Sequence, residues 1–169
     1  MITAHDVARE IRNQLPDAGR VKVQKLLYYA QGYHLAIHRE PLFDDEIQAW
    51  QYGPVVPSVY RADRYGQSSP IPAVALDDRQ MASVQMATGR FGGLFATELI
   101  AMTHAEAPWI DAKRQGGLNT PLDQESIGKY FRGHKVLDWD DDGEPDEMPA
   151  VVADEFDDIV ALDYDSIVS

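Results

Sequence analysis

The chain has 169 residues, of which 44% are hydrophobic, and this composition is sufficient for one domain with a buried core. It contains no cysteine, which excludes disulfides and thiolate metal sites and is consistent with a reducing, cytoplasmic location. No apolar run approaches the length of a membrane span, and the amphipathic N-terminus lacks the apolar region of a signal peptide. We therefore expect a cytoplasmic protein with no membrane partner.

The acidic residues are concentrated near the C-terminus. The net charge is −13, yet residues 1–137 contain fifteen acidic residues and fifteen Lys or Arg residues. Residues 138–169 contain thirteen acidic residues and no Lys or Arg. This division predicts a neutral domain over 1–137 and an acidic tail over 138–169. Nucleic-acid binders need a basic surface, so we expect no nucleic-acid ligand and instead a protein partner with a basic surface.

Two helices are predicted at the start of the chain. Thr3 and Asp6 form a capping box, and Pro16 ends the helix that follows. Residues 21–39 carry an apolar stripe on one face and further apolar side chains outside it, which predicts a central helix covered on two sides. Gly32 lies opposite the stripe, where a missing side chain would let another backbone approach. The stripe consists of Val23, Leu26, Leu27, Ala30, Tyr33, His34 and Ile37.

A short strand and two more helices are predicted in the middle of the chain. Apolar and polar residues alternate over 47–50, which indicates a strand. Residues 56–65 predict a short helix that begins around Pro57. Asp77 or Asp78 caps the next helix, which we expect to end at Thr88 because Gly89 follows.

The last helices of the domain are predicted between residues 94 and 133. Residues 94–104 form one, with Leu94, Phe95, Leu99 and Met102 recurring, and 105–114 add one or two turns. Residues 120–133 form another, with Thr120 as its N-cap. The predicted fold is mainly α: a single compact helical domain with at most a short β element, followed by the acidic C-terminal tail.

The tail divides into an acidic linker and an amphipathic segment. Residues 138–149 begin like a calcium-binding loop, but Pro149 occupies the position that requires a bidentate Glu, so we expect no calcium site. Residues 151–162 place apolar side chains opposite acidic ones, which is typical of a helix that docks on the domain or on a partner. The apolar side chains are those of Val152, Phe156, Ile159 and Val160.

The histidines do not indicate catalysis. His34 and His38 have the spacing of two metal ligands on a helix, but His34 lies in the apolar stripe, so a core histidine is the favoured interpretation and a metal ligand the alternative. We expect His104 to orient the turn into Pro108. The sequence contains no nucleophile constellation, phosphate-binding loop or dinucleotide fingerprint. It therefore predicts a protein that is not an enzyme, with no catalytic residues, metal or cofactor.

Three stretches together resemble a known family. "KLLYYAQGYHLA" (25–36), "EPLFDDEIQAWQYGPVVPSVYR" (40–61) and "ELIAMTHAEAPW" (98–109) occur in this order. They are similar to the SocA-like, or Panacea, antitoxin domain, over roughly residues 3–135. Tyr33 and Gln51 depart from the residues that the family often has, Trp and Pro. The acidic tail lies outside the resemblance.

The resemblance implies a bacterial or prophage antitoxin from a toxin–antitoxin system. Members of the family are often encoded beside a toxin gene and neutralise toxins by direct protein binding. One branch instead delivers its toxin to an AAA+ protease, so a proteolysis adaptor is the second hypothesis and an uncharacterised prophage enzyme the third. The family has no established catalytic residues, and the identity of the toxin does not transfer.

The aromatic segment from Ala49 to Arg61 has two interpretations. It is a scaffold if Trp50 and Tyr52 pack onto the second helix, the one that contains Tyr28 and His34, and we favour this role. It is a docking surface if its side chains contact the toxin directly. The residues assigned to the scaffold are Tyr28, His34, Trp50, Gly53, Pro57, His104 and Trp109, and those assigned to the partner are Tyr52, Pro54, Tyr60, Val152, Phe156, Ile159 and Val160.

Overall fold

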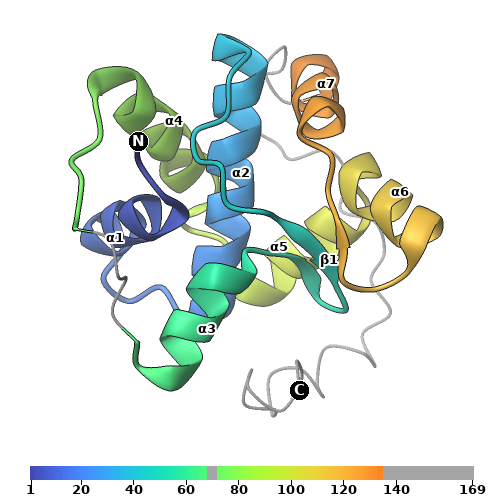
Figure 1. Cartoon of the computed structure of the whole chain (residues 1–169), viewed down its shortest axis with the longest axis horizontal. Helices are drawn as coiled ribbons and strands as arrows, with labels where there is room; N and C mark the ends of the chain where they lie inside the picture. Colours follow the sequence, from blue (N-terminus) through green and yellow to red (C-terminus); the bar gives the residue numbers. More distant parts are fainter. Residues whose placement is uncertain (68–71, 135–169) are drawn as a thin grey trace.

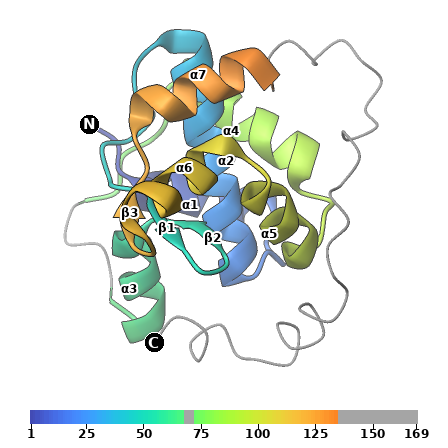
Figure 2. The same ribbon diagram turned by 90° about the vertical axis from the view of Figure 1, so that its right-hand side faces the viewer.

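A computed structural model describes residues 1–67 and 72–134. The predicted acidic linker and amphipathic segment, with their four apolar residues, lie outside these residues. The fold is mainly α, as predicted, with a small antiparallel sheet (Figures 1 and 2). The elements are α1 (Ala4–Gln14), α2 (Arg20–His38), β1 (Gln48–Trp50), β2 (Gly53–Val55), α3 (Pro57–Tyr65), α4 (Asp78–Phe91), α5 (Ala96–His104), α6 (Ala107–Gly116), β3 (Thr120–Pro121) and α7 (Gln124–His134).

Helix α2 forms the centre of the fold. Every residue from Val23 to Ala36 is buried, because α1 and α4 pack on one side of the helix and α7 on the other (Figure 1). The prediction of a covered central helix is confirmed, although Ile37, at the end of the predicted stripe, is 43% exposed. No helix in the part of the chain that the structure describes has the length and apolar composition needed to cross a bilayer.

The first helix begins and ends as predicted. The Thr3 hydroxyl accepts a hydrogen bond from the Asp6 N–H at 3.4 Å, and the Asp6 carboxylate accepts one from the Thr3 N–H at 2.8 Å. This reciprocal pair satisfies two N–H groups that have no partner inside the helix. The chain leaves the helix at Leu15, directly before Pro16.

Buried polar side chains of α2 bind the backbone of the segment that follows it. Gln24 accepts from the Val56 N–H at 2.8 Å, and Gln31 accepts from the Leu42 N–H at 2.7 Å. Gln31 also donates to the Phe43 carbonyl at 2.9 Å. Buried backbone groups must find partners, so these side chains hold residues 42–56 along the central helix.

The sheet is small and has the order β2–β1–β3. Strands β1 and β2 form a hairpin, defined here as residues 48–55, in which Trp50 lies opposite Gly53 across a loop of Gln51 and Tyr52. Ala49 is buried in the main core, whereas its neighbour Trp50 is half-buried on the other face of the strand. Thr120 of β3 pairs with Ala49 on the second edge of β1.

Three predicted helix boundaries are wrong, and tertiary contacts explain two of them. Helix α4 continues through Gly89 because Phe91 is buried, with its ring 4.1 Å from that of Tyr29. Thr120 does not cap α7, because it pairs in the sheet, and the Asp123 carboxylate accepts from the Ser126 N–H instead. Helix α5 begins at Ala96 rather than at residue 94, and the side chain of the preceding Phe95 is 77% exposed.

Candidate protein-binding face

Lys25 of α2 binds the hairpin from its buried side. The Lys25 ammonium donates to the Pro54 carbonyl at 3.0 Å, and the whole side chain is buried. Burial lowers the pKa of Lys25 to about 7, because the charged form loses its hydration. Gly53 permits this approach: its φ is +103°, and a Cβ atom there would lie 2.8 Å from Lys25 Cε.

His104 of α5 and Trp109 of α6 bind the backbone of the hairpin at its loop. The Trp109 indole N–H donates to the Trp50 carbonyl at 2.9 Å, and His104 Nε2 lies 2.9 Å from the Gln51 carbonyl. The rings of His104 and Trp109 are in contact, with centroids 4.2 Å apart and planes tilted by 31°. Burial lowers the pKa of His104 to about 4, so the neutral ring donates from Nε2. His104 therefore orients the hairpin loop, and its expected role at the turn into Pro108 stays a prediction.

Three of the residues assigned to the partner lie in the hairpin and α3, and they differ in their exposure to solvent. Tyr52 is half-exposed in the loop beside the exposed Gln51. Pro54 is buried over Lys25, and Tyr60 is buried with its ring 4.9 Å from that of Trp50. A buried side chain has no surface for a partner, so Tyr52 alone of these three is placed to make a side-chain contact.

Trp50 shares a cluster with Val21, near the start of α2, and does not lie in the main core with Tyr28. Its ring lies in a small cluster with Tyr60, Val55 and Val21, separate from the main core, and its indole N–H donates to Gln48 at 2.9 Å. The alternation of the strand explains this difference, because Ala49 takes the inward position. The expectation for Tyr52 also differs, since its side chain remains half-exposed.

The remaining scaffold residues lie in the interior or at the start of α3. Tyr28 is fully buried, with its ring 5.5 Å from that of Phe131. His34 is 3% exposed, and its Nδ1 lies 2.9 Å from the Ser83 hydroxyl. Pro57 occupies the first turn of α3, as its fixed φ favours. Within residues 1–67 and 72–134, no group of three His, Asp or Glu side chains is arranged to hold a metal.

Buried His34 predicts a loss of stability in acid. Burial, and then the neighbouring His38, lower its pKa from 6.5 to about 4, with Arg79 lowering it and Glu40 and Asp77 raising it. The unfolded chain therefore takes up the proton first as the pH falls. The stability present above pH 6.5 is lost between pH 6.5 and 4. We expect His34 by itself to lower the free energy of unfolding by about 2 kcal/mol between about pH 7 and pH 5, in addition to the loss that His104 causes over the same range.

Urea denaturation at each pH measures this loss. His34→Gln keeps a polar partner for Ser83 but removes the titrating ring, so it should reduce the dependence on pH. His134→Gln, at the exposed end of α7, is the control and should leave the slope unchanged. Equal slopes in the parent and His34→Gln would contradict the assignment.

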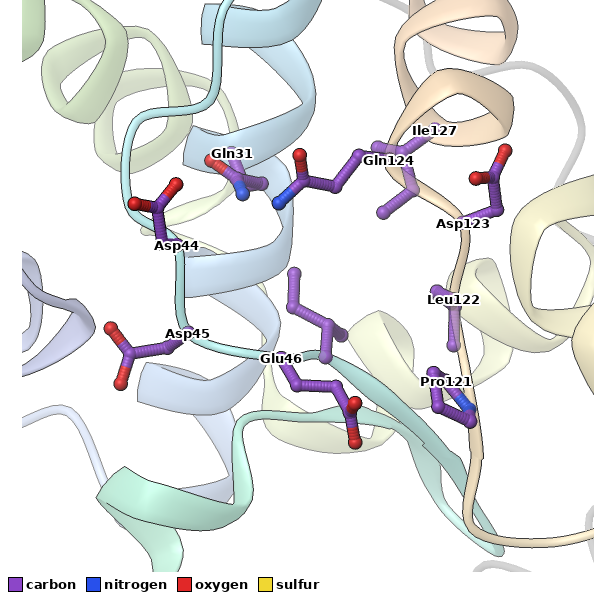
Figure 3. A pocket seen from close by; sticks show the side chains of 10 residues that line it. Gln31, Asp44, Asp45, Glu46, Pro121, Leu122, Asp123, Gln124 and Ile127 are labelled. Carbon is purple, nitrogen blue, oxygen red and sulfur yellow. The ribbon is translucent and has the colours of Figure 1, made fainter.

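A pocket with a cavity volume of about 530 Å³ opens beside the hairpin (Figure 3). The segment that precedes β1 forms one wall, the segment that enters α7 forms the opposite wall, and the Asp45 carboxylate points away from the cavity (Figure 3). We call this cavity the acidic pocket. It is lined by Gln31, Asp44, Asp45, Glu46, Ile47, Pro121, Leu122, Asp123, Gln124 and Ile127.

The sequence analysis did not identify the buried side chains that bind the hairpin and its flanking segment, or the residues that line the acidic pocket. Gln24, Lys25 and Gln31 stand among apolar residues on a central helix, and a polar residue in that setting is a signal for a buried hydrogen bond. The acidic residues from Asp44 to Glu46 are consecutive in the sequence, whereas Asp123 lies far from them along the chain. No local pattern brings these two segments together.

Comparisons with known proteins agree on one family. Residues 23–110 match the family model described as "Antitoxin SocA-like, Panacea domain". The protein named "Antitoxin SocA" from Caulobacter vibrioides is 28% identical over 160 residues, with 76% of this chain and 84% of that protein covered. No solved structure is significantly similar. The matched residues are fewer than the expected range of 3–135, but they include most of α2, the hairpin, His104 and Trp109.

Proposed function

Because the chain belongs to the antitoxin SocA-like family with the Panacea domain, we propose that it is an antitoxin that neutralises a cognate protein toxin by direct binding. The match over residues 23–110 carries this proposal, and the SocA relative supports it. The matched segment contains a hairpin whose loop is held by side chains from three helices.

The hairpin loop is suited to recognition because its backbone is already ordered. The carbonyls of Trp50, Gln51 and Pro54 each accept a hydrogen bond from a residue of the helices beneath. A partner that binds here pays little conformational entropy to order the loop. Tyr52 offers an aromatic ring and a hydroxyl at this place, a combination that is frequent in protein interfaces.

The acidic tail supports a partner with a basic surface. Its thirteen acidic residues speed the encounter with a positively charged protein, and salt screens this attraction. We propose that its apolar residues Val152, Phe156, Ile159 and Val160 add contacts to the toxin, as a helix does in a groove.

Tyr52→Ala tests the hairpin loop as part of the toxin interface. We expect this change to weaken binding of the toxin by about 2 kcal/mol, the scale of an aromatic interface residue, without changing the melting temperature. The first candidate for the toxin is the product of the neighbouring gene, because members of the family are often encoded beside a toxin gene. The affinity is measured by calorimetry on purified proteins.

Tyr65→Ala is the matched control. Tyr65 is 65% exposed at the end of α3, so its replacement removes the same side chain from a surface away from the hairpin loop. We expect this variant to bind like the parent. If Tyr52→Ala also binds like the parent, the hairpin loop is not in the interface and serves as scaffold alone.

A further inference from the structure

We propose that Glu106, bound by Tyr29 of α2, positions the hairpin loop and thereby sets the affinity for the toxin, an inference that rests on the proposed function. Glu106 lies in the turn between α5 and α6, the two helices whose side chains bind the loop. His104 precedes it by two residues, and Trp109 follows it by three. A displacement of this turn would therefore move both of these side chains together.

The side chain of Glu106 is buried and directed at the central helix. It is 2% exposed, and its carboxylate accepts a hydrogen bond from the Tyr29 hydroxyl at 3.1 Å. Glu106 is the N-cap residue of α6, yet its side chain forms no capping hydrogen bond within residues 106–116 of the described chain. A buried carboxylate loses its hydration, which costs free energy unless donors replace the water. The bond from Tyr29 therefore ties the α5–α6 turn to α2.

Tyr29 is a rigid anchor for this hydrogen bond. Its side chain is fully buried, and its ring stacks on that of Phe91 from α4, with centroids 4.1 Å apart. The ring of Phe131 from α7 lies 5.9 Å away at a steep angle. Burial, and then the charge of Glu106, raise the pKa of Tyr29 well above its usual value, so the hydroxyl stays protonated and remains a donor. The position of the donor is thus determined by the core of the domain.

Two hydrogen bonds connect the α5–α6 turn to the hairpin loop. His104 Nε2 lies 2.9 Å from the Gln51 carbonyl. The Trp109 indole N–H donates to the Trp50 carbonyl at 2.9 Å. These carbonyls belong to consecutive residues, directly before Tyr52. Because we propose that the Tyr52 side chain contacts the toxin, a loop that is not held in place would pay a larger entropic cost on binding.

A purely structural role for Glu106 predicts a different result. In that case, loss of its hydrogen bond would lower the stability of the domain but leave the loop and the toxin affinity unchanged. A control that breaks a buried hydrogen bond elsewhere on α2 distinguishes the two roles. Ser83 of α4 is 1% exposed, and its hydroxyl lies 2.9 Å from His34 Nδ1. Ser83→Ala therefore removes a buried contact between α2 and α4 rather than one at the α5–α6 turn.

The first experiment measures hydrogen exchange of the indole N–H groups by NMR in the full chain and needs no toxin. Tyr29→Phe removes the hydroxyl that binds Glu106 but keeps the stacked ring. We expect exchange of the Trp109 indole N–H to become about tenfold faster, because the loop then opens more often. The Trp50 indole N–H, which is bound within its own strand, should keep its rate. Ser83→Ala should change neither rate.

The second experiment measures toxin affinity in the same variants and in replacements of Glu106. Tyr29→Phe and Glu106→Leu should each weaken toxin binding about tenfold. The double variant should bind no more weakly than either one, because both changes break the same contact. Glu106→Gln keeps an oxygen that accepts from Tyr29 and should bind within about twofold of the parent. Ser83→Ala should bind like the parent. If Glu106→Leu does not fold, Tyr29→Phe alone supplies the result.

The outcomes separate the inference from the proposed function. If Tyr29→Phe leaves exchange of the Trp109 indole N–H at the parent rate, or leaves the toxin affinity unchanged, the inference is wrong while direct binding stands. If Ser83→Ala weakens toxin binding as much as Tyr29→Phe does, the effect is one of stability, and Glu106 has no positioning role. If the parent chain does not bind the toxin at all, the proposed function is wrong, whatever the exchange rates.

Discussion

Replacing Gly32 with alanine is expected to destabilise the fold by about 3 kcal/mol, because the new methyl group would overpack the core. A Cβ atom at Gly32 would lie 2.3 Å from the nearest atom of the Phe131 ring. That ring is fully buried among Tyr28, Tyr29 and Tyr33, with centroid separations of 5.4 to 5.9 Å, so it cannot turn away. Helix α7 would have to move off α2. Urea denaturation measures the loss.

Gly89→Ala is the matched control for this change. Gly89 also lies inside a helix, but nothing would lie within 4 Å of its Cβ atom. Alanine there should stabilise the protein by about 0.5 kcal/mol, because it restricts the unfolded chain. Phe131→Leu provides a further check, since Gly32→Ala should cost less in that background. Equal losses in both backgrounds would contradict close packing between α2 and α7.

Replacing Gly53 with alanine is expected to cost about 3 to 4 kcal/mol from backbone strain and overpacking together. The residue has a φ of +103°, which a side chain opposes. Its Cβ atom would also lie 2.6 Å from Thr103 Oγ1 and 2.8 Å from Lys25 Cε. Both neighbours are completely buried, so neither can move into solvent. Thermal melts of the variant and the parent measure the combined effect.

Gly66→Ala is the control that measures backbone strain alone, without close contact between the new Cβ atom and neighbouring side chains. Gly66 has a φ of +63° at the end of α3, and nothing would lie within 4 Å of its Cβ atom. Its replacement should cost only the strain of a left-handed residue, about 1 kcal/mol. If Gly53→Ala costs no more than Gly66→Ala, Lys25 and Thr103 do not press on the hairpin as the structure indicates.

Local signals were sufficient to predict the helices whose ends depend on local chemistry. Helix α1 starts at a capping box, and α3 starts at Pro57, so the residues that determine each start are neighbours in the sequence. The covered central helix was also predictable, since apolar side chains extend beyond one face. These features need no knowledge of the rest of the fold.

Tertiary contacts decided the elements that sequence reasoning misplaced. A glycine often ends a helix, but burial of Phe91 against Tyr29 keeps α4 helical past Gly89. Thr120 is a good N-cap residue, yet it pairs with Ala49 in the sheet. Gly32 was expected to admit another backbone, and the group that approaches is the ring of Phe131. Each outcome depends on a partner distant in the sequence.

The site was predictable only in part for the same reason. The aromatic segment was identified, but Ala49 takes the inward position of the strand, so Trp50 lies in a small cluster outside the main core. The acidic pocket depends on α7 lying opposite the segment before β1, and no pattern in either segment indicates the other. The buried hydrogen bond from Lys25 to the Pro54 carbonyl likewise follows only from the packing of the hairpin on α2.

The most direct test of direct neutralisation is to mix the purified chain with the purified toxin and measure both complex formation and toxin activity in the absence of any protease. We predict a stable complex in which the toxin is inactive, with an affinity that falls as salt is raised, because the tail is strongly negatively charged. A toxin that stays active in the mixture, and is neutralised in cells only when an AAA+ protease is present, would contradict the account and support an adaptor instead.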